Sequence, residues 1–263
     1  MKLKKTRGPK ILPIKEEENK EAKYHHEYLP EIGIGVPGKG ACLLLLSPRQ
    51  TGKSTIASNL FLNSCYFGEQ PNGDKFFDEI YVISPTINLD RTSRFLKNKC
   101  ICFDSYHPDI IKGILDTQLS FDEDERPEIA IFLDDCVGIM DKEIANLATR
   151  SRHYNIKLLA VSSQKFRGAL DPVLRANITD LIVGSPFPNL RDLTAVAEEF
   201  GDQFGSQENW LKLYKQCTPN KYDFCYCKLT NPPRIFKSFE EEMSFNADGS
   251  DCVEEEIEEE IAL

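Results

Sequence analysis

The feature that most constrains this chain is the run from Ala41 to Thr55, "ACLLLLSPRQTGKST". Its first six residues are all apolar, so a strand formed there must be covered on both faces, like the strands of a parallel sheet. The strand leads directly into "SPRQTGKST", which fits the phosphate-loop pattern G-x-x-x-x-G-K-[ST] except that Ser47 replaces the first glycine. A buried strand, this loop and a helix after it predict an α/β fold around a phosphate site.

Each position of the loop has a chemical role. Backbone N–H groups and the amino end of the following helix would bind phosphate, Lys53 would reach the β- and γ-phosphates, and the Ser54 hydroxyl would bind Mg²⁺. The first glycine only has to permit the turn out of the strand, so Ser47 can serve there, whereas the backbone of Gly52 faces phosphate and is harder to replace. The predicted nucleotide-binding residues are Ser47, Pro48, Arg49, Gln50, Thr51, Gly52, Lys53, Ser54 and Thr55. The alternative is a lysine-bearing turn that begins an ordinary helix.

A second motif, "IAIFLDDC", favours the nucleotide site. Its apolar run predicts a buried strand that delivers two acids to the carboxyl edge of the sheet. We expect Asp134 to support Mg²⁺ and Asp135 to orient or deprotonate the attacking water. A strand that ends in a solvated acidic turn is the alternative for this motif alone, but the two motifs together, in this order, predict a site for ATP and Mg²⁺.

Further polar residues could complete such a site. Gln164, at the end of the expected strand "IKLLAVSSQ", is placed to sense the γ-phosphate, with Ser163 as a second candidate; a solvent-facing glutamine is the alternative. Arg150 and Arg152 precede this strand and Arg175 follows it. A guanidinium at the γ-phosphate accelerates phosphoryl transfer and often comes from a neighbouring subunit. Ordinary surface ion pairs are the alternative for each arginine.

The remaining pattern alternates short buried strands with helical segments, which predicts a layered α/β domain with a mainly parallel sheet. We expect helices across residues 189–217, with Gly201 as the carboxyl-terminal cap of the first one. The segments "YDFCYCKL" and "RIFKSF" are expected to close the fold as an antiparallel pair. The predicted organisation is a basic flexible arm over residues 1–31, an ATPase domain over 32–239 and an acidic disordered tail over 240–263.

Charge and cysteine content exclude some classes of protein. The formal net charge is −10, but residues 240–263 hold eleven acidic residues and no Lys or Arg, so the body is near neutral. A single copy is therefore not expected to bind duplex DNA strongly. The nine cysteines include no C-x-x-C pair, which favours buried free thiols in a reducing compartment over metal sites or disulfides. With no secretory leader and no apolar run long enough to span a bilayer, we expect an intracellular, soluble protein without membrane contacts.

Taken together, these motifs resemble the genome-packaging ATPases of large DNA viruses and virophages, the poxvirus-type packaging ATPases of the FtsK–HerA group of phosphate-loop motors. The resemblance covers roughly residues 34–189 and rests on "LLLLSPRQTGKST", "IAIFLDDC", "RSRHYNIKLLAVSSQ" and "DPVLRANITDLIVGSPFPN". It implies a three-layer fold of the RecA-like type, with Lys53 and Ser54 in the phosphate loop and Asp134 and Asp135 on the acidic strand. Gln164 would be the sensor, and Arg152 matches the position of the group's arginine finger.

The resemblance also implies partners and a setting. Such proteins form rings of five or six subunits that pump double-stranded DNA into a preformed capsid, so a capsid or portal-vertex protein would be a partner, in the cytoplasmic virus factory or the virion. Two other functions stay open: an ATPase that remodels protein during virion assembly, and a nucleotide-switched scaffold that hydrolyses ATP weakly. The acidic tail would be either a solubilising segment or a docking helix.

Overall fold

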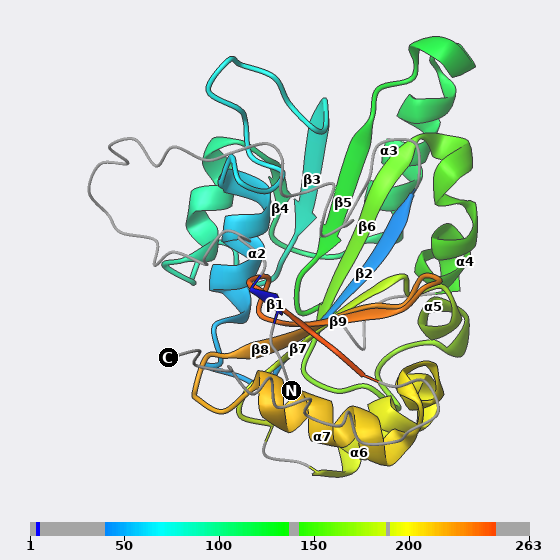
Figure 1. Cartoon of the computed structure of the whole chain (residues 1–263). Helices are drawn as coiled ribbons and strands as arrows, with labels where there is room; N and C mark the ends of the chain where they lie inside the picture. Colours follow the sequence, from blue (N-terminus) through cyan, green and yellow to red (C-terminus); the bar gives the residue numbers. More distant parts are fainter. Residues whose placement is uncertain (1–3, 6–39, 137–141, 188–189, 246–263) are drawn as a thin grey trace, which may run out of the picture.

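The computed structural model describes residues 4–5, 40–136, 142–187 and 190–245 (Figure 1). Its centre is one sheet with the strand order β1-β10-β9-β8-β7-β2-β6-β5-β3-β4. The run from β7 to β4 is parallel, and the strands from β8 to β1 continue the sheet in antiparallel fashion. The predicted α/β class with a mainly parallel central sheet is therefore confirmed.

The strands and helices follow the expected alternation along the chain. The strands are β1 Lys4–Lys5, β2 Ala41–Leu46, β3 Glu79–Ile83, β4 Ile101–Phe103, β5 Ile129–Leu133, β6 Ile156–Ser163, β7 Asp180–Gly184, β8 Phe224–Lys228, β9 Arg234–Lys237 and β10 Glu241–Met243. The α-helices are α2 Lys53–Leu62, α3 Pro108–Leu119, α4 Lys142–Arg150, α5 Pro172–Ala176, α6 Leu190–Phe200 and α7 Gln207–Cys217. Short 3-10 helices are η1 Ser93–Asn98, η2 Glu123–Glu125, η3 Ser151–Tyr154 and η4 Gly201–Phe204.

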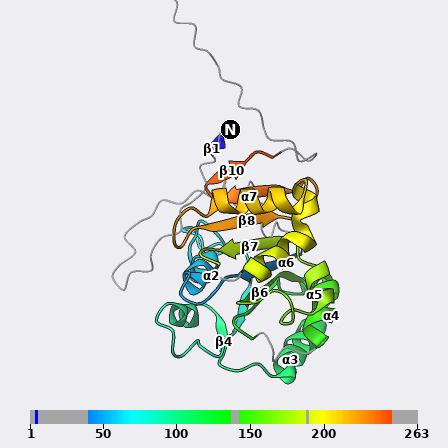
Figure 2. The ribbon, with the colours of Figure 1, turned by 90° about the horizontal axis from the view of Figure 1, so that it is seen from below.

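The all-apolar β2 is explained by the layers on its two faces. Cys42, Leu44 and Leu46 belong to a core shared with α3 to α7. The alternate residues Leu43 and Leu45 belong to a second core shared with α2. Figure 2 shows α2 on one side of the sheet and α4 to α6 on the other. A strand at the centre of such a three-layer fold exposes neither face, because successive side chains point in opposite directions.

The topology brings the sequence motifs to one edge. β2 lies between β6 and β7, and β5 follows β6, all in parallel. The carboxyl ends of β2, β5 and β6 therefore share one edge of the sheet, where the segments that follow them meet. Ligand sites of open α/β sheets lie at this edge.

Two details differ from the sequence-based expectation. The sheet continues past residue 239, because β10 pairs with β9 and with β1, so residues assigned to the tail and to the arm contribute strands. Gly201 is not a left-handed helix cap: it opens η4, and a Cβ there would lie 2.7 Å from the Cα of Gln207, so close packing of the chain requires the glycine. Residues 1–3 and 6–31 of the predicted arm and residues 246–263 of the predicted tail lie outside the described residues. No described helix has the length and apolar character needed to span a membrane.

Candidate functional site

The loop between β2 and α2 has left-handed backbone at two positions. Gly52 lies just before the first residue of α2 and has a φ of 89°, a left-handed conformation that favours glycine. Gln50 is also left-handed, with a φ of 60°. The Thr51 hydroxyl donates a hydrogen bond of 2.7 Å to the Pro48 carbonyl and closes the loop on itself. The loop is thus shaped by its own contacts, with Lys53 at the start of the helix.

Ser47, the departure from the phosphate-loop pattern, is accommodated by a neighbouring strand. It is buried, its backbone N–H donates to the Ser163 carbonyl at 2.9 Å, and its hydroxyl is hydrogen-bonded to the hydroxyl of Thr51. A Cβ on Gly184, at the end of β7, would lie only 2.2 Å from the Ser47 Oγ. Gly184 therefore makes room for the serine. Sequence reasoning missed this residue, since nothing local in "DLIVGS" marks it.

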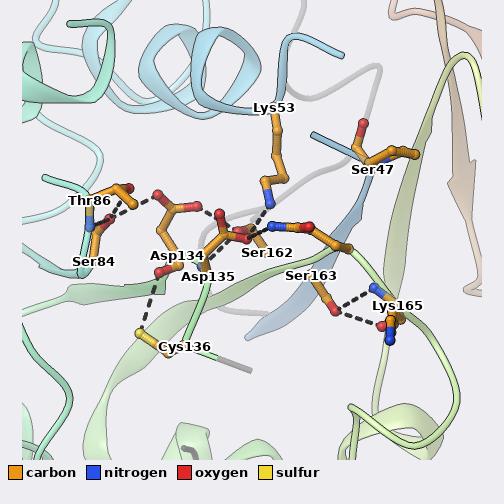
Figure 3. A network of polar contacts seen from close by, with 12 residues as sticks. Ser47, Lys53, Ser84, Thr86, Asp134, Asp135, Cys136, Ser162, Ser163 and Lys165 are labelled. Atoms are coloured by element: carbon orange, nitrogen blue, oxygen red, sulfur yellow. Dashed lines mark hydrogen bonds and ion pairs between the residues drawn. The ribbon is translucent and has the colours of Figure 1, made fainter. Parts of the chain in front are cut away.

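Three of the predicted residues converge beside the loop (Figure 3). The ammonium of Lys53 forms an ion pair with the Asp135 carboxylate, and the Gln164 amide donates to the same carboxylate oxygen at 3.5 Å. Asp135 has a φ of 51°, which is uncommon for a residue other than glycine. Strained backbone of this kind persists where the surrounding structure enforces it, and it is concentrated at functional sites. The structure therefore places a cation, an acid and an amide within reach of one point.

The other acid, Asp134, is held in place by hydrogen bonds from two serine hydroxyls. Its carboxylate is buried, with 3% of the residue exposed, and accepts hydrogen bonds from Ser162 at 2.6 Å and from Ser84 at 3.0 Å. Burial raises the pKa of Asp134 above its usual value, and the hydrogen bond from Ser162 opposes this rise. Ser162 also accepts from the backbone N–H of Asp135 at 3.1 Å, so one hydroxyl positions both acids.

The roles of the serines were not foreseen from the sequence. Ser163, the second candidate for the sensor, instead bonds to the backbone of Lys165, at 2.6 Å to its carbonyl and 3.1 Å to its N–H. Ser162, within β6, and Ser84, directly after β3, were not singled out, because nothing in the local sequence shows that their hydroxyls reach the Asp134 carboxylate. Successive side chains of a strand point to opposite faces of the sheet, so the sequence could have indicated that Ser162 and Ser163 face opposite sides.

Lys53, Asp135 and Gln164 line a cavity of about 1260 Å³. Its walls include the loop from Pro48 to Gln50, the start of α2, and the side chains of Asp135 and Gln164. Residues 221–224, Ser238 and Glu240 also line the cavity. This volume exceeds the usual range for small-molecule sites, about 300–1,000 Å³, and is sufficient for a nucleoside triphosphate.

The oxygen donors present are compatible with Mg²⁺. Among the described residues there is no cluster of three or more His, Cys, Asp or Glu side chains able to hold a metal ion. Mg²⁺ bound with a nucleotide needs no such cluster, since phosphates and waters supply most of its ligands beside one or two protein groups. Ser54 lines the cavity, and Asp134 is buried. The Ser54 hydroxyl and the Asp134 carboxylate are oxygen donors of the hard type that Mg²⁺ prefers.

The three candidate arginines do not join the site within this chain. Arg152 lies in η3, at the amino end of β6, whereas Gln164 follows the carboxyl end. A strand of this length spans about 26 Å, at roughly 3.3 Å per residue. Arg150 is paired with Glu143 at 3.6 Å. The mostly buried Arg175 is paired with Glu199 at 2.8 Å.

The cysteines of the described residues are free thiols. Those in the described residues form no disulfide, and most are buried. Cys225 and Cys227 lie on one face of β8, with their sulfur atoms 3.7 Å apart. Burial raises the pKa of the Cys136 thiol, the cysteine nearest the two acids, to about 12. Such thiols behave as small apolar side chains rather than as nucleophiles.

Comparisons with known proteins agree with the fold. No protein-family model matches the sequence, and no curated protein matches it. Among solved structures, the DNA-packaging ATPase B204 from Sulfolobus turreted icosahedral virus aligns with a TM-score of 0.51 at 12% identity, over 75% of this chain and 97% of that one. The genome-packaging NTPase B204 of Sulfolobus turreted icosahedral virus 2, in complex with ATP-γS, aligns with a TM-score of 0.49 at 16% identity, over 74% and 96%.

A third similar structure is the pCW3 conjugation coupling protein TcpA, with a TM-score of 0.47 at 15% identity, over 76% of this chain and 60% of that one. At these identities the likeness concerns the fold. The likeness to packaging ATPases that the sequence motifs indicate is thus confirmed at that level: the chain has the fold of a viral DNA-packaging ATPase.

Proposed function

We propose that this protein is an ATP-hydrolysing motor that translocates double-stranded DNA and packages a viral genome into a preformed capsid. The observation that carries the enzymatic part is the convergence of Lys53, Asp135 and Gln164 on one point of the cavity. The DNA-handling part is supported by the sequence motifs and by the likeness in fold to a DNA-packaging ATPase.

We infer a task for each side chain from its contacts. Lys53, now paired with Asp135, would exchange this partner for the phosphates of ATP, since both acceptors are anionic oxygens in the same cavity. Asp135 is then released to accept a proton from the attacking water, and Gln164 orients that water from the end of β6. A Mg²⁺ ion held by Ser54 and supported by Asp134 would supply charge neutralisation for the phosphates.

The assembly part of the proposal concerns the source of an arginine finger at the γ-phosphate. Each of the three candidate arginines lies away from Lys53 or is engaged by an acid. We therefore infer that an arginine finger comes from the next subunit of a homo-oligomeric ring, with Arg152 as the donor, in addition to Arg49, which lines the cavity in the same chain. Several copies that line one channel also need few phosphate contacts each, which suits a near-neutral body.

Turnover of ATP by the purified full chain, with and without linear duplex DNA, tests the proposal. We expect hydrolysis that duplex DNA stimulates, lost in Lys53→Ala and retained in Lys99→Ala, whose exposed lysine pairs with Glu69 on the surface. Hydrolysis indifferent to DNA would favour protein remodelling instead. Nucleotide binding without turnover would favour the switched scaffold.

A further inference from the structure

Residues 221–223, at the end of the turn between α7 and β8, line the cavity, and the proposed function assigns them no role. Tyr222 is one of them and is 58% exposed. Its ring lies against the phosphate loop: a Cβ built on Gly52 would be 3.6 Å from the Tyr222 Cδ1. A large aromatic side chain is thus held open to solvent inside a cavity, next to the residue where the loop meets α2.

The backbone holds Tyr222 in an uncommon conformation. Its φ is 74°, in the left-handed region that bulky residues avoid. The surrounding hydrogen bonds enforce this: the Tyr222 N–H donates to the Ser185 carbonyl at 3.3 Å, and the Ser185 N–H donates to the Asp223 carbonyl at 2.9 Å. The Asp223 carboxylate accepts from the backbone N–H of Asn220 at 2.8 Å. Such enforced conformations are typical of ligand-binding positions.

The position of the turn relative to the catalytic group indicates which part of a nucleotide it would meet. Gln164 and Asp135 lie on the β6 side of β2, and they mark where the γ-phosphate reacts. The turn lies on the β7 side, since β8 begins at Phe224 opposite Gly184. A triphosphate that runs along the loop with its γ end toward Gln164 must direct its sugar and base toward the β7 side.

We propose that Tyr222 is the residue that stacks against the nucleobase. The inference rests on the proposed nucleotide site and adds its base-binding part. The ammonium of Lys221 lies 4.7 Å from the centroid of the Tyr222 ring, a cation–π contact that holds one face of the ring and leaves stacking to the other. Every base has a π face, so stacking on tyrosine selects for the presence of a base rather than for its identity.

Inorganic tripolyphosphate separates this role from support of the loop, because it presents the phosphates of ATP without a base. In calorimetric titrations of the full chain with Mg²⁺, Tyr222→Ala should bind ATP and GTP more weakly by roughly 5- to 150-fold, the range spanned by stacking of one base. Its affinity for tripolyphosphate should stay within about twofold of the wild-type value. Tyr222→Phe should bind all three ligands like the wild type.

Two further variants control for effects other than the loss of the Tyr222 ring. Tyr222→Gly removes the ring while accepting the left-handed backbone, so it should reproduce Tyr222→Ala even if alanine disturbs the turn. Phe121→Ala truncates another exposed aromatic residue, outside the cavity, and should change nothing.

The outcomes separate this inference from the function on which it rests. Equal losses for ATP and tripolyphosphate in both ring-less variants would overturn the stacking role in favour of a structural one, as would unchanged ATP affinity. A wild-type protein that binds neither ligand would refute the nucleotide site itself. A wild-type protein that binds both ligands equally tightly would refute only the contact with the base.

Discussion

Replacing Gly184 by alanine tests how the fold tolerates a serine in place of the first glycine of the phosphate loop. The added Cβ would lie 2.2 Å from the Oγ of Ser47 and 3.0 Å from its Cβ, and the next nearest atom, the Oγ1 of Thr51, is at an ordinary 3.8 Å. Because Ser47 is buried and bonded to Thr51, it cannot rotate away freely. Overpacking of this kind costs about 1–3 kcal/mol of unfolding free energy.

The matched change is Ser47→Gly, which restores the ordinary loop residue and removes both close contacts. Alone it should cost about 1–2 kcal/mol, from the lost hydrogen bond to Thr51 and the added chain entropy of glycine. In the double variant, Gly184→Ala should add almost nothing to this cost. The expected coupling free energy is therefore about 1–3 kcal/mol: the double variant should be that much more stable than the sum of the two single costs predicts.

Urea unfolding of the four proteins at one pH measures this cycle, with ATP affinity as a second readout of the loop. Gly113→Ala is the control for glycine replacement in general, because a Cβ there meets no atom within 4 Å. It should leave the unfolding free energy unchanged or raise it slightly. Costs for Gly184→Ala and Ser47→Gly that simply add, within about 0.5 kcal/mol, would refute the packing argument.

The remaining predictions concern the acids and the arginine. Asp135→Asn should keep ATP bound but slow single-turnover hydrolysis by about 10²- to 10⁴-fold, because the water loses its base while Lys53 is freed for phosphate; loss of ATP binding would mean that the two acids have the opposite roles. Arg152→Ala should bind ATP normally and lose on the order of 10³-fold in turnover, and rings mixed with Lys53→Ala subunits should recover some activity, unless the finger acts within its own subunit. Ser162→Ala should raise the pKa of Asp134 further. Its stability loss, about 1.5–3 kcal/mol for a hydrogen bond to a charged group, should thus grow with the ionised fraction of the buried carboxyl and should shrink as pH falls through its raised folded-state pKa. Urea unfolding at pH 7 and pH 5 without Mg²⁺ checks this, and equal losses at both values would contradict it.

The linear order of the chain was sufficient to predict the central strands and the residues that meet at their ends. An apolar strand, a phosphate loop and a helix are local patterns; β2 has its expected bounds, and α2 follows the loop as expected. Because parallel strands share a carboxyl edge, the acids after β5 and Gln164 after β6 could be expected near Lys53 before any contact was known.

Contacts between segments distant in sequence depend on the tertiary structure instead. Gly184 is needed only because β7 packs beside β2 and brings its last residue against Ser47. From the sequence, Tyr222 is an ordinary turn residue. Its position against Gly52 follows from the pairing of β8 with β7. The pairing of β10 with β1 joins the two ends of the described chain, which composition alone assigns to an arm and a tail. Periodicity and motifs report what each segment can form by itself, whereas these positions are set by steric fit between segments that no local pattern records.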